Sequence, residues 1–233
     1  MAHVDAIFLD MDGTILRLEI STAAMNATRE KLRQLFLEHG IDKTFRPVLA
    51  TIRTSLQALA ERGAPADAIG DQAYQILDEL EEDGAAHASI CIGAEKVLMD
   101  WHGSGRKMSL ISNNGRAAVK RALTTSGLSL NMFASVVSRD DVMCEKPHPE
   151  PILKTLRQLE LLTEEASIVM IGDSINDMRS ARAAVAVAPV RMSIATIAVG
   201  EQIHQDLGTE AGLVDRYAAG WMDLPQILDD LEA

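Results

Sequence analysis

The amino-acid sequence predicts an α/β protein, built on a parallel β-sheet with helices on both faces and carrying a small α-helical insertion after the first strand. Three features predict this class. A short apolar run, residues 6–9, lies near the start of the chain and ends at a turn marked by Gly13. Short apolar runs alternate with helical stretches beyond Gly93, as in parallel strands joined by right-handed crossovers. Between these two regions, residues 21–82 have helical periodicity throughout.

Three helices are expected within the insertion. The first ends near Gly40, the second spans residues 47–62 and the third spans residues 67–83. One helix suffices to connect two parallel strands, so the excess predicts an insertion lying over the functional site, with an independent helical domain as the alternative. The expected domains are an α/β core, residues 1–16 and 90–233, and a helical insertion, residues 17–89.

Helices and strands are expected to alternate in the rest of the chain. The predicted helices are residues 94–101, 116–126, 149–161, 175–184 and 224–231. The predicted strands are residues 107–111, 134–138, 167–171 and 194–199. Because open parallel sheets bind ligands at the carboxyl ends of their strands, functional side chains are expected directly after these strands.

The composition excludes some classes of function. Hydrophobic residues make up 47% of the chain and aromatic residues 3%, which predicts a packed aliphatic core. The formal net charge of −12 argues against nucleic acid or an anionic membrane as a partner. The N-terminus shows no secretory leader, no apolar run has the length of a membrane span, and Cys91 and Cys144 lack metal-binding spacing. We therefore expect a cytoplasmic protein, and the sequence leaves its oligomeric state open.

Two aspartates, Asp10 and Asp12, follow the first strand directly. Side chains two residues apart in extended backbone point the same way, so both carboxylates can face one site. Carboxylates this close repel each other, and a hard divalent cation such as Mg²⁺ relieves the repulsion. The alternative interpretation is an acidic turn, because Asp and Gly are both common in turns.

Two further aspartates, Asp173 and Asp177, come after the predicted strand 167–171, around the start of a helix. Capping and the helix dipole alone favour aspartate at such positions. Together with Asp10 and Asp12, however, they would gather four carboxylates at one edge of the sheet. Such a cluster is strongly destabilised without a cation, so the sequence predicts a Mg²⁺ site formed by these four aspartates.

Three other polar residues are candidates for binding a phosphoryl group. Ser112 and Asn113 end a predicted strand and offer a hydroxyl and an amide, although a plain turn would look the same. Lys146 lies in a proline-rich segment that could hold its charge beside the carboxylates; the alternative is a surface lysine. His148 is a less suitable general base than Asp12, which is better placed.

Taken together, these residues resemble the motifs of the haloacid dehalogenase superfamily. The first motif is DMDGT at residues 10–14, the second is Ser112-Asn113, the third is Lys146-Pro147 and the fourth is GDSIND at residues 172–177. All four occur in the order and spacing of the superfamily, and the resemblance covers nearly the whole chain. It implies a Rossmann-like core with a helical cap, and the likeness is greatest to the phosphoglycolate phosphatase-like group.

The resemblance also implies a role for each residue. Asp10 would be the nucleophile that forms an aspartyl-phosphate, and Asp12 would protonate the leaving oxygen and then activate water. Asp10, the backbone carbonyl of Asp12 and Asp173 would hold Mg²⁺, with Asp177 close to the metal. Ser112, Asn113 and Lys146 would bind the phosphoryl group. Arg46 and Arg53 are candidate cap contacts to the substrate.

The expected function is therefore Mg²⁺-dependent hydrolysis of a small phosphorylated metabolite. A sugar phosphomutase of the β-phosphoglucomutase type would use the same aspartates, and a non-catalytic metabolite-binding protein could keep the same fold. The motifs leave these alternatives and the identity of the substrate open.

Overall fold

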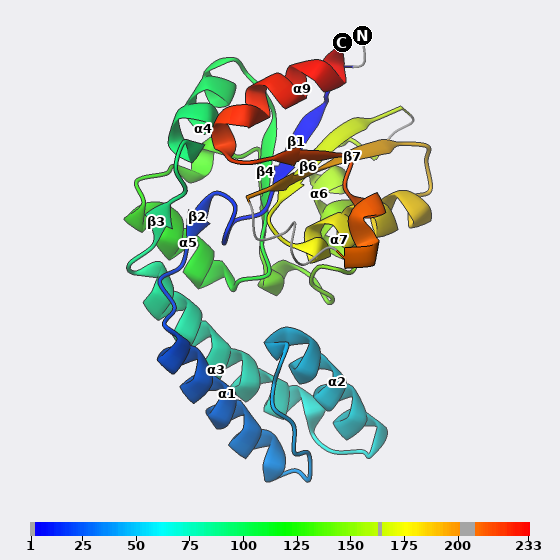
Figure 1. The fold of residues 1–233 in the computed structure, drawn as a ribbon. Helices are drawn as coiled ribbons and strands as arrows, with labels where there is room; N and C mark the ends of the chain where they lie inside the picture. The colour runs from blue at the N-terminus through cyan, green and yellow to red at the C-terminus, as the bar shows by residue number, and fades with distance from the viewer. Residues whose placement is uncertain (1–2, 163–164, 201–207) are drawn as a thin grey trace.

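Six parallel strands form the central sheet of the computed structural model, which describes residues 3–162, 165–200 and 208–233. Their order is β5-β4-β1-β6-β7-β8, and each pairs in parallel with its neighbours. The first strand of the chain therefore lies inside the sheet (Figure 1). The predicted α/β class is confirmed. The strands are β1 (Ala6–Leu9), β4 (Met108–Ile111), β5 (Ser135–Val137), β6 (Ser167–Gly172), β7 (Ser193–Val199) and β8 (Arg216–Ala218).

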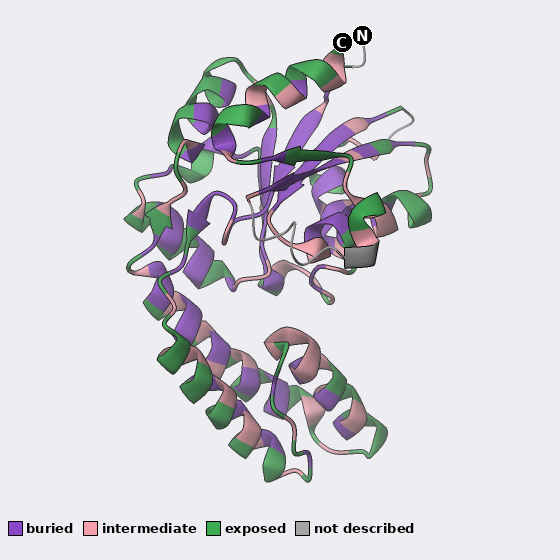
Figure 2. Cartoon of the chain, in the orientation of Figure 1, coloured by how far each residue is buried: buried purple, intermediate pink, exposed green. Residues whose placement is uncertain are grey.

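Helices cover both faces of this sheet, which is why β1 is buried along its whole length. Successive side chains of a strand point to opposite faces. On one face, Ile7 and Leu9 pack with residues of α4 (Ala94–Gly103), α5 (Arg116–Thr125) and α9 (Leu224–Glu232). On the other face, Ala6 and Phe8 pack with residues of α6 (Glu150–Gln158) and α7 (Ile175–Val187). Figure 2 shows the result, with buried strands between helices that are exposed on their outer sides.

Three helices, α1 (Thr22–Leu37), α2 (Val48–Glu61) and α3 (Ala66–Ala85), pack together beside the sheet (Figure 1). We call them the three-helix unit. They have a hydrophobic cluster of their own, in which the rings of Phe36 and Phe45 lie 5.1 Å apart between centroids. The chain enters and leaves this unit through an antiparallel pair, β2 (Leu16–Arg17) and β3 (Ser89–Ile90). The sequence did not predict this pair, because two-residue strands leave no periodicity to detect.

Some predicted elements differ in length from those in the structure. Helix α6 ends at Gln158 rather than at residue 161, because Glu160 adopts a left-handed conformation (φ 58°) and the Leu161 N–H bonds back to the carbonyl of Leu156. This is a Schellman-type end formed without the usual glycine. Helix α7 continues to Val187, beyond its predicted end at residue 184. Strand β8 was not predicted, because its three residues lie at the edge of the sheet and are partly exposed.

None of the described helices combines the length and the apolar character that crossing a bilayer requires.

Candidate active site

The carboxyl ends of three neighbouring strands bring the predicted site residues together. Strand β1 lies between β4 and β6, so the residues that follow these strands meet at one edge. Asp10 follows β1, Ser112 follows β4 and Asp173 follows β6. A cavity of about 200 Å³ at this edge is lined by residues including Asp10, Asp12, Asn113, Lys146, Asp173 and Asp177.

Lys146 is buried at the centre of this cluster. Its Nζ lies 2.6 Å from an oxygen of Asp10 and 2.6 Å from an oxygen of Asp177, and it also donates to the Ile111 carbonyl at 2.7 Å. Burial alone would lower the pKa of Lys146, but the charges of Asp10 and Asp177 outweigh it and raise the pKa. The lysine is therefore a fixed positive charge between two carboxylates.

Asp10, Asp173 and Asp177 each place a carboxylate oxygen within 4.8 Å of the other two. Burial, with the charges of Asp10 and Asp177, raises the pKa of Asp173 to about 7. Burial and Asp10 likewise raise the pKa of Asp177 to about 6, against the lowering effect of Lys146. One lysine does not compensate these carboxylates, and an all-oxygen set of this kind suits a hard divalent cation. The donor set thus fits Mg²⁺.

Asp12 lies at the edge of this cluster and is held differently. Its carboxylate accepts a 2.9 Å hydrogen bond from the Leu18 N–H, in the segment that leads into the three-helix unit. Burial raises its pKa to about 6, with a smaller contribution from Asp10. The Asp12 carboxylate is not part of the three-carboxylate group, and its predicted metal contact, through the backbone carbonyl, stays a prediction.

Gly13 and Gly172 let the backbone pass close to these carboxylates. Gly13 has φ +88°, and a Cβ there would lie 2.0 Å from an oxygen of Asp173. A Cβ on Gly172 would lie 2.3 Å from an oxygen of Asp177. Glycine is therefore required at both positions for steric reasons.

Asn113 lines the 200 Å³ cavity, whereas Ser112 is buried directly after β4 and is not among the lining residues. Both ends of the Asn113 amide bind the backbone of Lys146: Nδ2 donates to the Lys146 carbonyl at 2.8 Å, and Oδ1 accepts from the Lys146 N–H at 3.0 Å. Asn113 therefore positions the lysine. The Ser112 hydroxyl is buried and contacts the backbone N–H and side-chain oxygen of Asn114 at 3.1 and 3.0 Å.

Glu81 of α3 also lines the cavity, and no sequence motif pointed to it. It is buried and accepts hydrogen bonds at 2.8 Å from the Gly115 N–H and from Nη1 of Arg139. Arg139, equally buried, further contacts Asp78 of α3 and the Asn113 carbonyl. These bonds attach the three-helix unit to the loop after β4, through Gly115, and to the segment after β5, through Arg139. Periodicity could not reveal them, because they join segments far apart in the chain.

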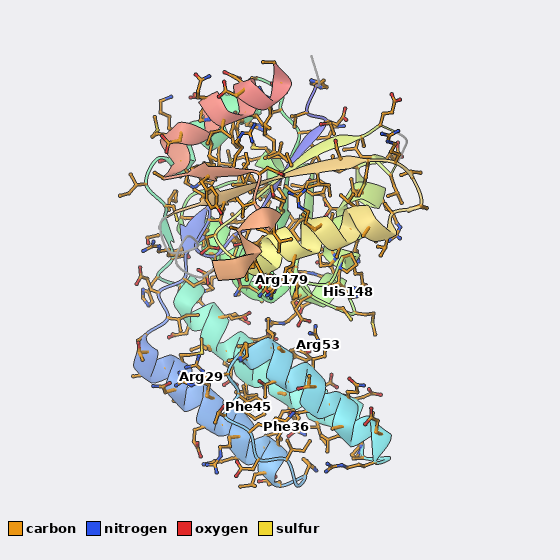
Figure 3. All side chains as sticks on the ribbon, turned by 45° about the vertical axis from the view of Figure 1, so that its right-hand side comes forward. Arg29, Phe36, Phe45, Arg53, His148 and Arg179 are labelled. Atoms are coloured by element: carbon orange, nitrogen blue, oxygen red, sulfur yellow. The ribbon has the colours of Figure 1, made fainter. Side chains whose placement is uncertain are left out.

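A second cavity, about 410 Å³, adjoins the first and shares Leu49, Glu81, Asn113 and Lys146 with it. It lies between the three-helix unit and the sheet, and Arg53 and Arg179 line it. Figure 3 shows Arg53 on α2 and Arg179 on α7 facing this space from opposite sides. Arg53 forms a 2.9 Å ion pair with the buried Glu145, next to Lys146.

Two other residues considered from the sequence lie outside these cavities. Arg46, a candidate substrate contact, lines neither cavity and instead donates to Oδ1 of Asn26 at 3.0 Å. His148 is exposed, and its Nδ1 accepts from the Glu150 N–H at 3.2 Å (Figure 3). The choice of Asp12 over His148 as the acid–base candidate agrees with this placement.

Comparison with known proteins gives a consistent result. The chain is 28% identical over 193 residues to a phosphoglycolate phosphatase of Colwellia psychrerythraea, covering 77% of this chain and 80% of that protein. It is 26% identical to an N-acetylmuramic acid 6-phosphate phosphatase of Pseudomonas putida, covering 76% and 78%. The crystal structure of a hydrolase from Pseudomonas syringae, 20% identical, superimposes with a TM-score of 0.64 over 97% of this chain and 98% of that one.

A family model for haloacid dehalogenase-like hydrolases matches residues 7–188, most of the chain. This range contains all four predicted motifs. The predicted enzyme class, a phosphoric monoester hydrolase of this type, is confirmed by the family match together with the phosphatase relatives. From its motifs, its fold and this match, the chain belongs to the haloacid dehalogenase-like hydrolase family.

Proposed function

We propose that this hydrolase is a Mg²⁺-dependent phosphatase that removes the phosphoryl group of a small metabolite through an aspartyl-phosphate on Asp10. The observation that carries the proposal is the buried Lys146, which bridges Asp10 and Asp177 at 2.6 Å to each. A carboxylate is a competent nucleophile toward phosphorus only where positive charge offsets its repulsion from the phosphate. The lysine supplies part of that charge at the nucleophile itself.

The two chemical steps follow from the positions of Asp10 and Asp12. In the first step an Asp10 oxygen bonds to phosphorus while the bond to the leaving oxygen breaks, and Asp12 donates a proton to that oxygen. In the second step Asp12 takes a proton from water as the water oxygen attacks phosphorus, which releases phosphate and restores Asp10. A pKa of about 6 suits Asp12 to both roles, because both protonation states are accessible near neutral pH.

Asp10, Asp173 and Asp177 would hold Mg²⁺, together with the backbone carbonyl of Asp12. When bound, the ion would neutralise phosphoryl oxygens and orient them for in-line attack. The hydroxyl of Ser112 would bind a phosphoryl oxygen, while Asn113 holds Lys146 in place.

The three-helix unit, within the predicted boundaries of residues 17–89, would act as a cap that excludes water from the first step. The 410 Å³ cavity beneath it would take the remainder of the substrate. Phosphoglycolate and N-acetylmuramic acid 6-phosphate, named for two relatives, each carry a carboxylate besides the phosphate. Arg53, paired with Glu145, and Arg179, paired with Glu210, line this cavity, and a second acidic group of the substrate would replace those carboxylates as their partner.

The test is phosphate release from a panel of phosphorylated metabolites, with Mg²⁺ and with EDTA, using wild type and Asp10→Asn. We expect release that needs Mg²⁺ and is lost in Asp10→Asn. Accumulation of a phosphate isomer without free phosphate would instead identify a phosphomutase, and binding without turnover would identify a non-catalytic protein. Full activity in Asp10→Asn would contradict the assigned nucleophile.

The substrate class has its own test. Arg53→Met is expected to raise KM about tenfold or more for substrates that carry a second acidic group, and to leave KM for p-nitrophenyl phosphate nearly unchanged. Arg62→Met, an exposed arginine at the end of α2, is the matched control. An equal effect of Arg53→Met on both kinds of substrate would contradict the assignment.

A further inference from the structure

The three-helix unit contains a cationic hollow separate from the catalytic cavities. It has a volume of about 610 Å³ and is lined by residues of α1 and of the segment that leads to α2. Four cationic side chains and two carboxylates face it, on a protein whose net charge is −12. The hollow therefore has a local excess of positive charge, although the protein as a whole is acidic. The lining residues used below are Asn26, Arg29, Arg33, Asp42, Lys43 and Arg46.

Both carboxylates of this hollow are already engaged by one arginine. Arg33 makes two hydrogen bonds to Asp42, at 2.6 and 3.2 Å, and lies 3.6 Å from Glu30. Within the part of the chain that the structure describes, Lys43 donates only to the Thr54 hydroxyl, at 3.3 Å. Because both carboxylates bind Arg33, they form no ion pair with the other cations of the hollow, Arg29, Lys43 and Arg46.

Of the three arginines that line this hollow, Arg29 and Arg46 have no acidic partner among the residues that the structure describes. They converge on a single neutral acceptor, Oδ1 of Asn26, at 3.1 and 3.0 Å. The Nε of Arg29 is buried and has no hydrogen-bond partner within the described part of the chain. Partial burial and repulsion from Arg46 lower the pKa of Arg29. Two like charges held together in this way are unfavourable, and a bound anion would relieve them.

Packing holds the backbone that carries Arg46 next to α1. Phe45, next to Arg46, is fully buried and packs against Phe36 of α1 (Figure 3). Its φ of +52° is unusual for a residue with a side chain, and such outliers persist only where packing imposes them. Figure 3 also shows Arg29 on α1, away from Arg53 and Arg179.

We propose that the hollow formed by Asn26, Arg29, Lys43 and Arg46 is a binding site for a small soluble anion that carries two or more charges on phosphoryl oxygens. Two guanidinium groups offer forked donors that match such oxygens in pairs. An ammonium group on the same hollow adds a third point of attachment. The proposal does not depend on the catalytic role assigned to the aspartates.

The occupied site would connect α1 to the segment before α2. Pro47 and Val48, which follow Arg46, line the 410 Å³ cavity, as does Met25, which precedes Asn26. An anion held between Arg29 and Arg46 would therefore fix two parts of the wall of that cavity relative to each other.

The test is titration of the whole protein with pyrophosphate in EDTA by calorimetry, where no divalent cation draws anions to the carboxylate cluster. We expect one site in wild type, an affinity at least tenfold weaker in Arg29→Gln and in Arg46→Gln, and little change in Arg62→Gln. Titration with citrate tests whether a carboxylate anion binds at this site. Titration with inorganic phosphate tests whether a single phosphoryl group is sufficient for binding. Absence of pyrophosphate binding, equal affinity in all four proteins, or binding of citrate in preference to pyrophosphate would overturn the proposal.

Thermal unfolding of the same variants gives a second readout that a merely structural role would not produce. Without anion, Arg29→Gln and Arg46→Gln are expected to melt at the same or a higher temperature than wild type, because one of two repelling charges is gone. With pyrophosphate, wild type is expected to gain stability and both variants to gain little. Lower stability of both variants without anion, with an undiminished gain on adding it, would contradict the proposal.

Discussion

Nζ of Lys146 donates a 2.6 Å hydrogen bond to Oδ1 of Asp10, with both side chains almost fully buried. The two residues are 136 positions apart in the chain. The same nitrogen also contacts Asp177. A buried cation shared by two carboxylates orients Asp10, the proposed nucleophile, and reduces the electrostatic cost of burying its negative charge.

Replacing Lys146 by Met is expected to lower kcat by about 100-fold or more, because a preorganised charge at the reacting oxygens is lost. In EDTA the variant should also be less stable, since Asp10 and Asp177 would be left buried without a partner. Phosphate release and urea unfolding measure the two effects. Lys120→Met, an exposed lysine on α5, is the matched control. Activity of Lys146→Met within a few fold of wild type would contradict the role given to this lysine.

The stability of the metal-free protein is expected to fall as pH rises from 5 to 8. Burial raises the pKa values of Asp12 and Asp177 to about 6 and of Asp173 to about 7, from an ordinary 3.8. The folded state then binds these protons more tightly than the unfolded state. The stabilisation is fully present below about pH 4 and is lost as pH rises through 6 to 7.

Urea unfolding in EDTA at several pH values measures this trend. Mg²⁺ should stabilise the protein most at the upper end of the range, because it favours the ionised carboxylates. Asp173→Asn should flatten the metal-free profile. A metal-free stability that is constant or rises between pH 5 and 8 would contradict the assignment.

Gly172→Ala is expected to lower activity by about 100-fold through a displacement of Asp177, since the new Cβ would lie 2.3 Å from a carboxylate oxygen of that residue. Its apparent affinity for Mg²⁺ should fall as well. The matched control is Gly103→Ala at the end of α4, where a Cβ meets nothing within 4 Å. Equal activity of the two variants would show that the close approach is not required.

Arg139→Met is expected to destabilise the protein by about 3–5 kcal/mol, because it leaves Glu81 buried without its cation. Glu81→Gln should also lower the free energy of unfolding. The loss in the double variant should be smaller than the sum of the two single losses, by a coupling energy of about 0.5–3 kcal/mol. Urea unfolding of the four proteins measures the cycle. Arg116→Met, which removes an exposed ion pair to Asp141, should cost less than about 1 kcal/mol. Additive single effects would show that the two residues do not interact.

The sequence was sufficient for most of the fold and for the positions of the clustered carboxylates, because both depend on local signals. Residues 6–9 read as a buried strand and are one, and Asp10 follows that strand directly. The positions of Asp173 and Asp177 follow from the strand and helix on either side of them. Parallel pairing then brings separate strand ends to one edge without further information.

The remaining features depend on contacts between distant segments. The residues around Arg139 in the sequence do not distinguish it from a surface arginine. Its burial against Glu81 follows only from the packing of α3 on the segments after β4 and β5. Asn113 looked like a phosphate ligand, and the structure adds a contact that the sequence could not reveal, since both ends of its amide bind the backbone of Lys146. Arg46 and Arg53 looked equivalent in sequence, and the structure places only Arg53 beside the catalytic cavity.

The most direct test of the proposed mechanism is to find where the phosphoryl group goes during turnover. The enzyme would be mixed with Mg²⁺ and its best substrate, quenched in acid within milliseconds, digested, and examined by peptide mass spectrometry. The account predicts a transient phosphoryl group on the peptide that contains Asp10, absent in Asp10→Asn and in EDTA. Rapid hydrolysis with no phosphorylated peptide, or a phosphoryl group on another residue, would contradict it.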